Sequence, residues 1–107
     1  MSVSMKDLER LDLRVARIAS VERLPGMKKI MKARVDLGDR IVEAIMGGAE
    51  FYQPDDLNGK LVAVVANMEP RIVAGVKSAC MLLAADDRGK PIWLTLREEV
   101  APGTKIR

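Results

Sequence analysis

The sequence predicts an all-β fold. Three observations carry this prediction: stretches in which apolar and polar residues alternate, Gly- and Pro-containing turns that separate those stretches at regular intervals, and a composition with 49% hydrophobic and 31% charged residues. At 107 residues the chain can build one hydrophobic core, and no repeat or linker divides it. We therefore expect a single domain over residues 1–107.

The first half of the chain is expected to hold a short helix and three strands. Ser4 followed by Asp7 is typical of a helix N-cap with an acid in the first turn, which predicts a helix over Met5–Leu11. The alternation that follows predicts three strands, over residues 13–23, 29–37 and 40–46, with turns at Pro25-Gly26 and Gly38-Asp39.

The second half is expected to complete a barrel. Pro54–Leu57 predicts one helical turn before a fourth strand over Lys60–Ala66, which is apolar on both faces and should be covered by the helical elements or by another subunit. Further strands are expected over residues 79–85 and 92–96, around a turn at 86–89, and the tail 100–106 is expected to add an edge strand. The count fits a five-stranded barrel of the oligonucleotide/oligosaccharide-binding (OB) type with C-terminal extension strands, and it also fits other small barrels.

Missing residue types argue against an enzyme. The chain has no His, which removes Cys–His and Ser–His nucleophile pairs, and with a single Cys it cannot build a zinc site. The acidic pairs are consecutive, so their side chains should diverge, and we interpret them as cap, turn and surface residues: Asp55/Asp56, Asp86/Asp87 and Glu98/Glu99. We predict no catalytic residue, no bound metal and no cofactor.

The cellular location is predicted from features that the sequence lacks. No window reaches the ~18 consecutive apolar residues of a membrane span, and the first residues do not have the layout of a signal peptide. Cys80, the one cysteine, cannot form an internal disulfide and is interpreted as a small buried hydrophobic residue. We therefore expect a cytoplasmic protein that does not contact membranes.

Positive charge is concentrated in two segments, although the formal net charge is only +3. Residues 28–34 and 70–78 contain no acid, whereas acids outnumber bases between them. If the two segments meet in space, they form a patch that attracts phosphates; the plainer interpretation is two solvated strand faces. The basic side chains concerned are Lys28, Lys29, Lys32, Arg34, Arg71 and Lys77.

Aromatic residues are scarce. Phe51, Tyr52 and Trp93 are the only ones, too few for the row of stacking side chains that binds single strands. Any binding of nucleic acid should therefore depend on phosphate contacts and shape, which favours a structured RNA.

Several motifs together resemble one known family. They are Asp12-Leu13-Arg14-Val15, Val35-Asp36-Leu37-Gly38, Val65-Ala66-Asn67-Met68-Glu69-Pro70-Arg71, Gly75-Val76-Lys77-Ser78 and Met81-Leu82-Leu83-Ala84. The chain resembles the tRNA-binding domain family from about residue 12 to residue 105. Members of this family occur as free-standing structure-specific tRNA-binding proteins, at the C-terminus of many methionyl-tRNA synthetases and in the endothelial-monocyte-activating polypeptide.

The resemblance implies an OB barrel that recognises the outer corner of tRNA by shape. Asn67, Pro70, Arg71, Gly75, Ser78 and Met81 match the family motif, and Arg14 matches the basic position of the first strand. With the basic residues above, the predicted tRNA-binding set is Arg14, Lys28, Lys29, Lys32, Arg34, Asn67, Arg71, Lys77, Ser78 and Met81. Asn67 and Ser78 could instead satisfy backbone groups within the loop, and Met81 could pack beneath it.

Two departures from the family pattern concern the RNA-binding face. Ser78-Ala79-Cys80-Met81 carries a thiol where members commonly have Gly, and Leu24–Ile30 keeps only the Pro and the final apolar residue of the usual His-Pro-x-Ala-Asp-x-Leu segment. The fine geometry at both places is expected to differ from that of other members.

The resemblance also implies partners. Free-standing members form homodimers, so a homodimer is expected, and an aminoacyl-tRNA synthetase is a possible second partner. The sequence also resembles the CsaA family of dimeric export-related chaperones, whose C-termini are similar to residues 100–106. The alternative function is therefore the binding of unfolded polypeptide. Exposed Met and Ile side chains in a groove would favour this function, whereas a flat basic face would favour RNA binding.

Overall fold

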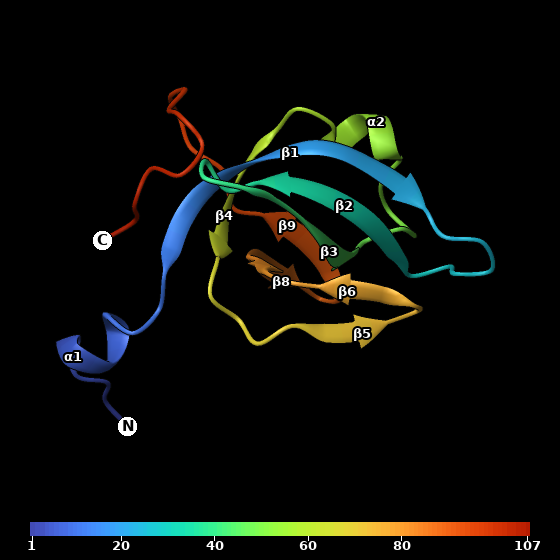
Figure 1. Ribbon diagram of the computed structural model, residues 1–107. Coiled ribbons are helices and arrows are strands. Elements are labelled where there is room, and N and C mark those ends of the chain that lie inside the picture. The colour runs from blue at the N-terminus through green and yellow to red at the C-terminus, as the bar shows by residue number, and fades with distance from the viewer.

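The computed structural model describes all 107 residues and contains an antiparallel five-stranded barrel, which confirms the predicted fold class (Figure 1). The strands hydrogen-bond in the order β3-β2-β1-β4-β7. Their bounds are β1 (Leu13–Arg23), β2 (Ile30–Asp36), β3 (Ile41–Gly47), β4 (Leu61–Val65) and β7 (Met81–Leu82). The barrel nearly closes between β3 and the approach to β7, where the Ala79 amide donates to the Glu43 carbonyl at 3.0 Å. This arrangement is that of an OB barrel.

Two hairpins project from this barrel. The sequence predicted a loop in place of the first, and it predicted the second as a turn between two strands but with other bounds. The segment between the fourth strand and residue 79, expected to be a loop, contains the hairpin β5 (Arg71–Val73) and β6 (Val76–Ser78). The strand expected over residues 79–85 is divided between β7 and β8 (Ala84–Asp87), and β8 pairs only with β9 (Lys90–Trp93). Strands of two to four residues are too short to show a clear alternating pattern, which explains both errors.

Both helices are single turns. The helix α1 (Met5–Leu8) is shorter than the expected Met5–Leu11, but the Ser4 hydroxyl accepts from the Asp7 amide as predicted, at 3.1 Å. The helix α2 (Pro54–Leu57) begins with a capping box in which Gln53 and Asp56 satisfy each other's backbone amides. Neither helix has the length and apolar character required to cross a membrane.

The core lies inside the barrel. Its largest fully buried side chains include Ile18 and Val62 on neighbouring strands and Met31 and Val35 on β2, and Leu57 is the one buried residue of α2. β4 is buried on both faces, as expected, and the chain covers both faces without a second subunit.

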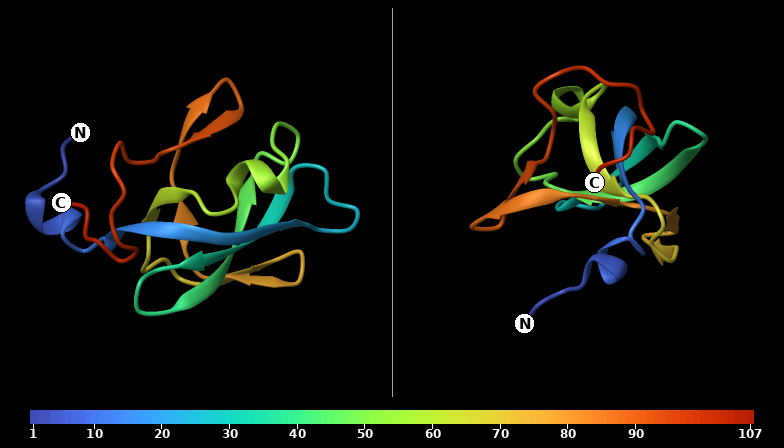
Figure 2. Two further views of the ribbon diagram at one scale, coloured as in Figure 1. Left: turned by 90° about the horizontal axis from the view of Figure 1, so that it is seen from above. Right: turned by 90° about the vertical axis from the view of Figure 1, so that its left-hand side faces the viewer.

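The C-terminal tail lies along the start of β1, where the sequence predicted that it would add an edge strand. The Val15 amide donates to the Thr104 carbonyl at 2.8 Å, and Arg14 and Lys105 form an isolated antiparallel bridge. Close packing at Gly38 fixes the tail against the β2–β3 turn, because a Cβ atom there would lie 2.6 Å from the Pro102 carbonyl oxygen. The tail and α1 therefore lie at the same end of the barrel (Figures 1 and 2).

Candidate nucleic-acid interface

The two basic segments of the sequence lie on and beside the outer face of β2 and β3. The β1–β2 loop and the tip of the β5–β6 hairpin both project at the end away from α1 (Figures 1 and 2). The outer face of β2 and β3 lies between them, because β6 runs beside β3. The β2–β3 face and the two loops next to it are the surface on which OB barrels bind oligonucleotides.

Five cations on this surface have no acidic partner. They are Lys28 and Lys29 in the β1–β2 loop, Arg34 on β2, and Arg71 and Lys77 on the hairpin; all five are exposed and none takes part in a salt bridge or side-chain hydrogen bond. We call these five residues the basic face. Their positive charge is free to interact with an external anion.

Lys32 differs from its neighbours on β2. Its ammonium nitrogen lies 2.7 Å from a carboxylate oxygen of Glu22 and 3.2 Å from one of Glu43. Hydrogen bonding to Glu22, then to Glu43, raises the pKa of Lys32. The lysine is therefore neutralised within the protein, and the three side chains together carry a net negative charge in the middle of the β2–β3 face.

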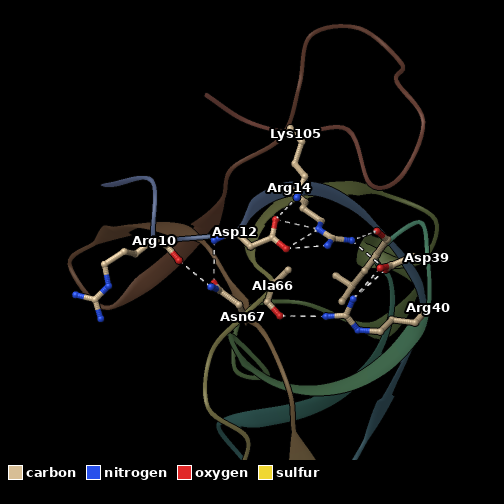
Figure 3. A network of polar contacts seen from close by, with 9 residues as sticks. Arg10, Asp12, Arg14, Asp39, Arg40, Ala66, Asn67 and Lys105 are labelled. Carbon is tan, nitrogen blue, oxygen red and sulfur yellow. Dashed lines mark hydrogen bonds and ion pairs between the residues drawn. The ribbon is translucent and has the colours of Figure 1, made fainter. Parts of the chain in front are cut away.

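Arg14 lies far from the β1–β2 loop and is not part of the basic face. β1 runs from Leu13 to the β1–β2 loop at Arg23, so Arg14 is at the other end of a strand that extends about 3.3 Å per residue. Its guanidinium donates to Asp12 at 2.7 Å, to Asp39 at 2.9 Å and to the Leu37 carbonyl at 3.1 Å (Figure 3). The interactions with Asp12, and then with Asp39, raise the pKa of Arg14. Arg14 therefore has two acidic partners within the protein.

The same network holds Asp12 ionised. Besides Arg14, its carboxylate accepts from the Lys105 ammonium at 2.6 Å (Figure 3). The hydrogen bonds from Arg14 and Lys105 lower the pKa of Asp12 from 3.8 to about 2. Arg40 extends the network by donating to Asp39 at 2.9 Å and to the Ala66 carbonyl at 3.4 Å.

Asn67 and Ser78 hydrogen-bond to backbone groups of the protein. The Asn67 amide accepts from the Asp12 backbone amide and donates to the Arg10 carbonyl, both at 2.8 Å (Figure 3). The Ser78 side chain is buried, and its hydroxyl accepts from the Ile45 amide at 3.0 Å. Both side chains thus fix the segment that carries the hairpin, Asn67 at its base and Ser78 at its junction with β3.

Met81 does not pack beneath the loop. It is half exposed on β7, and the same segment exposes Met68 and Ile72. Cys80, by contrast, is buried in the core, and burial raises the pKa of its thiol to about 11. The thiol that replaces the usual Gly therefore points away from the exposed surface.

Sequence reasoning missed two things in this region. The hairpin turn at Ala74 and Gly75 brings Arg71 and Lys77 onto one short ribbon, and the pair Ala-Gly is a weaker turn signal than Asn-Gly or Asp-Gly. It also missed Arg88, an exposed cation at the tip of the β8–β9 hairpin, because the flanking strands are short. No group of three or more acidic or Cys side chains is arranged to hold a metal ion.

The fold and the basic face place the chain in the class of OB-fold binding modules. A family model described as "Putative tRNA binding domain" matches residues 13–105. The chain therefore belongs to the tRNA-binding domain family.

Known relatives and structures are consistent with this assignment. The chain is 41% identical over 97% of its length to methionine–tRNA ligase of Archaeoglobus fulgidus and 45% identical over 98% to that of Methanoculleus marisnigri, and it spans 16% of each ligase. It superposes on a MetRS-related protein from Pyrococcus horikoshii with a TM-score of 0.93 and 27% identity, covering 100% of this chain and 99% of the other. It superposes on the CsaA chaperone of Bacillus anthracis with a TM-score of 0.89 and 28% identity, covering 100% of both chains.

Proposed function

We propose that this protein binds folded tRNA through the basic face, recognising its shape and phosphates. The observation that carries the proposal is the presence of five unpaired cations, from two distant parts of the sequence, on and beside the β2–β3 face of an OB barrel that belongs to a tRNA-binding family. Phosphate contacts fix the position of an RNA without reading its bases, so little preference among tRNAs is expected. A tRNA partner implies the cytoplasm as the compartment.

The charge of the basic face predicts the salt dependence of binding. Each phosphate that a cation neutralises releases a condensed counterion, and the logarithm of the binding constant falls with the logarithm of salt concentration by about 0.7–0.9 per contact. If all five cations contact phosphates, the slope is between about −3.5 and −4.5. We propose that Lys28, Lys29, Arg34, Arg71 and Lys77 make the phosphate contacts, because these five cations have no internal partner. Arg14, Lys32, Asn67 and Ser78 of the predicted set have partners within the protein, and Met81 is exposed but carries no charge.

The proposal is tested by comparing three ligands in fluorescence-anisotropy titrations. They are folded tRNA, a single-stranded RNA of the same length and an unfolded polypeptide. Preferred binding to folded tRNA is expected. Equal affinity for the two RNAs would contradict recognition by shape.

Chaperone activity is the second candidate, and the exposed apolar side chains of residues 68–81 favour it. Met68, Ile72 and Met81 offer contact area to an unfolded chain, and CsaA proteins are among the structural neighbours. In the same titrations, tight binding of the unfolded polypeptide that persists at high salt, with no preference for tRNA, would establish this function instead.

We further propose that the protein forms a homodimer through α1. This helix buries none of its residues, and Met5, Leu8 and Leu11 line, with Ile106, an exposed groove of about 600 Å³. Covering this apolar surface with a second copy would remove it from water. Sedimentation should show a dimer that Leu8→Lys converts to a monomer; a wild-type monomer at tens of micromolar would contradict it.

A methionyl-tRNA synthetase is the proposed partner enzyme. The relatives named above are methionine–tRNA ligases that contain a segment similar to this chain. Addition of the protein to a synthetase that lacks such a segment should raise the affinity of that synthetase for tRNA. An unchanged affinity would argue for a stand-alone binder.

A further inference from the structure

A cleft opens beside the basic face and shares one residue, Lys29, with it. It has a volume of about 660 Å³ and lies between the start of β2, the end of β3 and the β8–β9 hairpin, which projects from the barrel (Figure 2). Its lining includes Lys29, Gly48, Phe51, Ala85, Arg88 and Pro91. Lys29 belongs both to the cleft and to the basic face, so a ligand on the basic face could extend directly into the cleft.

The walls of the cleft are held together by hydrogen bonds and close packing. The Ala49 amide donates to the Lys29 carbonyl at 3.3 Å, and the Tyr52 hydroxyl donates to the Pro91 carbonyl at 2.7 Å. Gly48 has a φ of +91°, and a Cβ atom there would lie 3.0 Å from the Pro91 side chain. The cleft is therefore formed before any ligand arrives, which lowers the entropic cost of binding.

The side chains around the cleft combine an aromatic ring with charges of both signs. Phe51 is 48% exposed, and the Lys90 ammonium lies 5.9 Å from the centre of its ring. Lys29 and Arg88 are exposed and have no ion-pair partner, and the carboxylates of Glu50 and Asp86 also line the cleft. A ligand that fits this set has a flat aromatic part, an anionic group and hydrogen-bond donors.

We infer that the cleft binds one unstacked nucleotide of the bound RNA, with its base against Phe51 and its phosphate between Lys29 and Arg88. Unpaired bases of structured RNA stack on aromatic side chains, and carboxylates accept hydrogen bonds from exocyclic amines and ribose hydroxyls. A cleft of this volume lies within the ordinary range for small-ligand sites. The inference rests on the proposed function, since the RNA must first be held on the basic face.

The test compares folded tRNA with a fully paired RNA duplex, which offers no unstacked nucleotide. Phe51→Ala should weaken binding of tRNA by about 5-fold to 150-fold, the range for one stacked base, with the salt slope unchanged. Binding of the duplex should not change. Phe51→Trp should retain the wild-type affinity for tRNA because it keeps an aromatic face.

Two further variants control for folding and for general loss of apolar surface. Ile41 is exposed at the opposite end of β3, so Ile41→Ala should bind tRNA as the wild type does. Arg88→Gln does not disturb the core, and it should lower the magnitude of the salt slope by about one for tRNA and leave the duplex unaffected.

The outcomes separate this inference from the proposed function. Wild-type affinity for tRNA in both Phe51→Ala and Arg88→Gln, or equal weakening for tRNA and duplex, would overturn the nucleotide cleft while leaving the basic face as the RNA-binding site. Failure of the wild-type protein to bind tRNA would overturn both.

Discussion

At the scale of single residues, position in the barrel decides which cations are free to interact with an external anion. Arg14 and Lys32 carry the same charge as Arg71 and Lys77, but each is neutralised by two carboxylates. The sequence shows that these residues are basic; it does not show that the acids on neighbouring strands reach them. Such pairing depends on strand register. Lys32 lies opposite Glu22 on β1 and opposite Ile45 on β3, and the second pairing places it diagonal to Glu43.

Removing one of these carboxylates should strengthen RNA binding. Glu43→Gln removes a negative charge from the β2–β3 face and frees Lys32 from one of its two acidic partners. Folded tRNA should bind more tightly, and the salt slope should steepen by up to about one. Glu98→Gln, on the exposed C-terminal segment outside the basic face and the α1 groove, is the charge-matched control. Unchanged binding by Glu43→Gln would show that RNA does not approach the middle of β2 and β3.

At the scale of elements, the β5–β6 hairpin determines where two of the five free cations lie. Ala74 and Gly75 at its turn have φ angles of 51° and 79°, so both central residues are left-handed, as a type I′ turn requires. Gly tolerates this conformation, whereas the Cβ of Ala makes it unfavourable by roughly 1–2 kcal/mol. The turn is therefore strained at Ala74.

Relieving this strain should stabilise the protein. Asn adopts the left-handed conformation more readily than Ala, so Ala74→Asn should raise the free energy of unfolding by about 0.5–1 kcal/mol. The melting temperature should rise by a few degrees. Ala74→Val, which adds a branched Cβ at the same position, should lower it. A lower melting temperature for Ala74→Asn would contradict the turn described here.

The sequence predicted the long elements well and the short ones poorly. β1, β2, β3 and β4 each show alternation or a continuous apolar run over five residues or more, and all four lie within one or two residues of their expected bounds. The β5–β6 and β8–β9 hairpins have strands of only three or four residues, and their form is set by turn conformation and by contacts such as the bond from the Ile45 amide to Ser78. The sequence identified the five residues of the basic face as basic but missed Arg88, and the division into free and paired cations required the tertiary structure.

At the scale of the whole molecule, the paired charges and the unpaired cations of the basic face occupy different parts of the barrel. The end next to α1 contains the network of Asp12, Arg14, Asp39, Arg40 and Lys105, which joins β1, the β2–β3 turn and the C-terminal tail (Figure 3). The basic face lies on and beside β2 and β3, with Lys28 and Lys29 in the β1–β2 loop at the end away from α1. Substitutions in the two groups should therefore affect different properties, stability in the first and RNA affinity in the second.

Acid should destabilise the protein through Asp12. The pKa of Asp12 is about 2 in the folded state and 3.8 as the ordinary value, which applies to the unfolded state. Its stabilising contribution is therefore complete above the unfolded-state pKa and is lost as pH falls through the folded-state pKa. That contribution is about 2 kcal/mol. Urea unfolding at pH 7 and near pH 2 should show a smaller loss of stability on acidification for Asp12→Asn than for the wild type. Equal losses would show that this network does not control acid stability.

The central claim is that unpaired cations of the basic face hold tRNA by its phosphates. The most direct measurement is the salt dependence of tRNA affinity for Arg71→Ala, compared with Arg97→Ala, which removes an exposed and unpaired arginine from the C-terminal segment that follows β9 and is not part of the basic face. The account predicts that Arg71→Ala weakens binding and lowers the magnitude of the slope by about one, while Arg97→Ala leaves both unchanged. The same slope for Arg71→Ala and the wild type would contradict it.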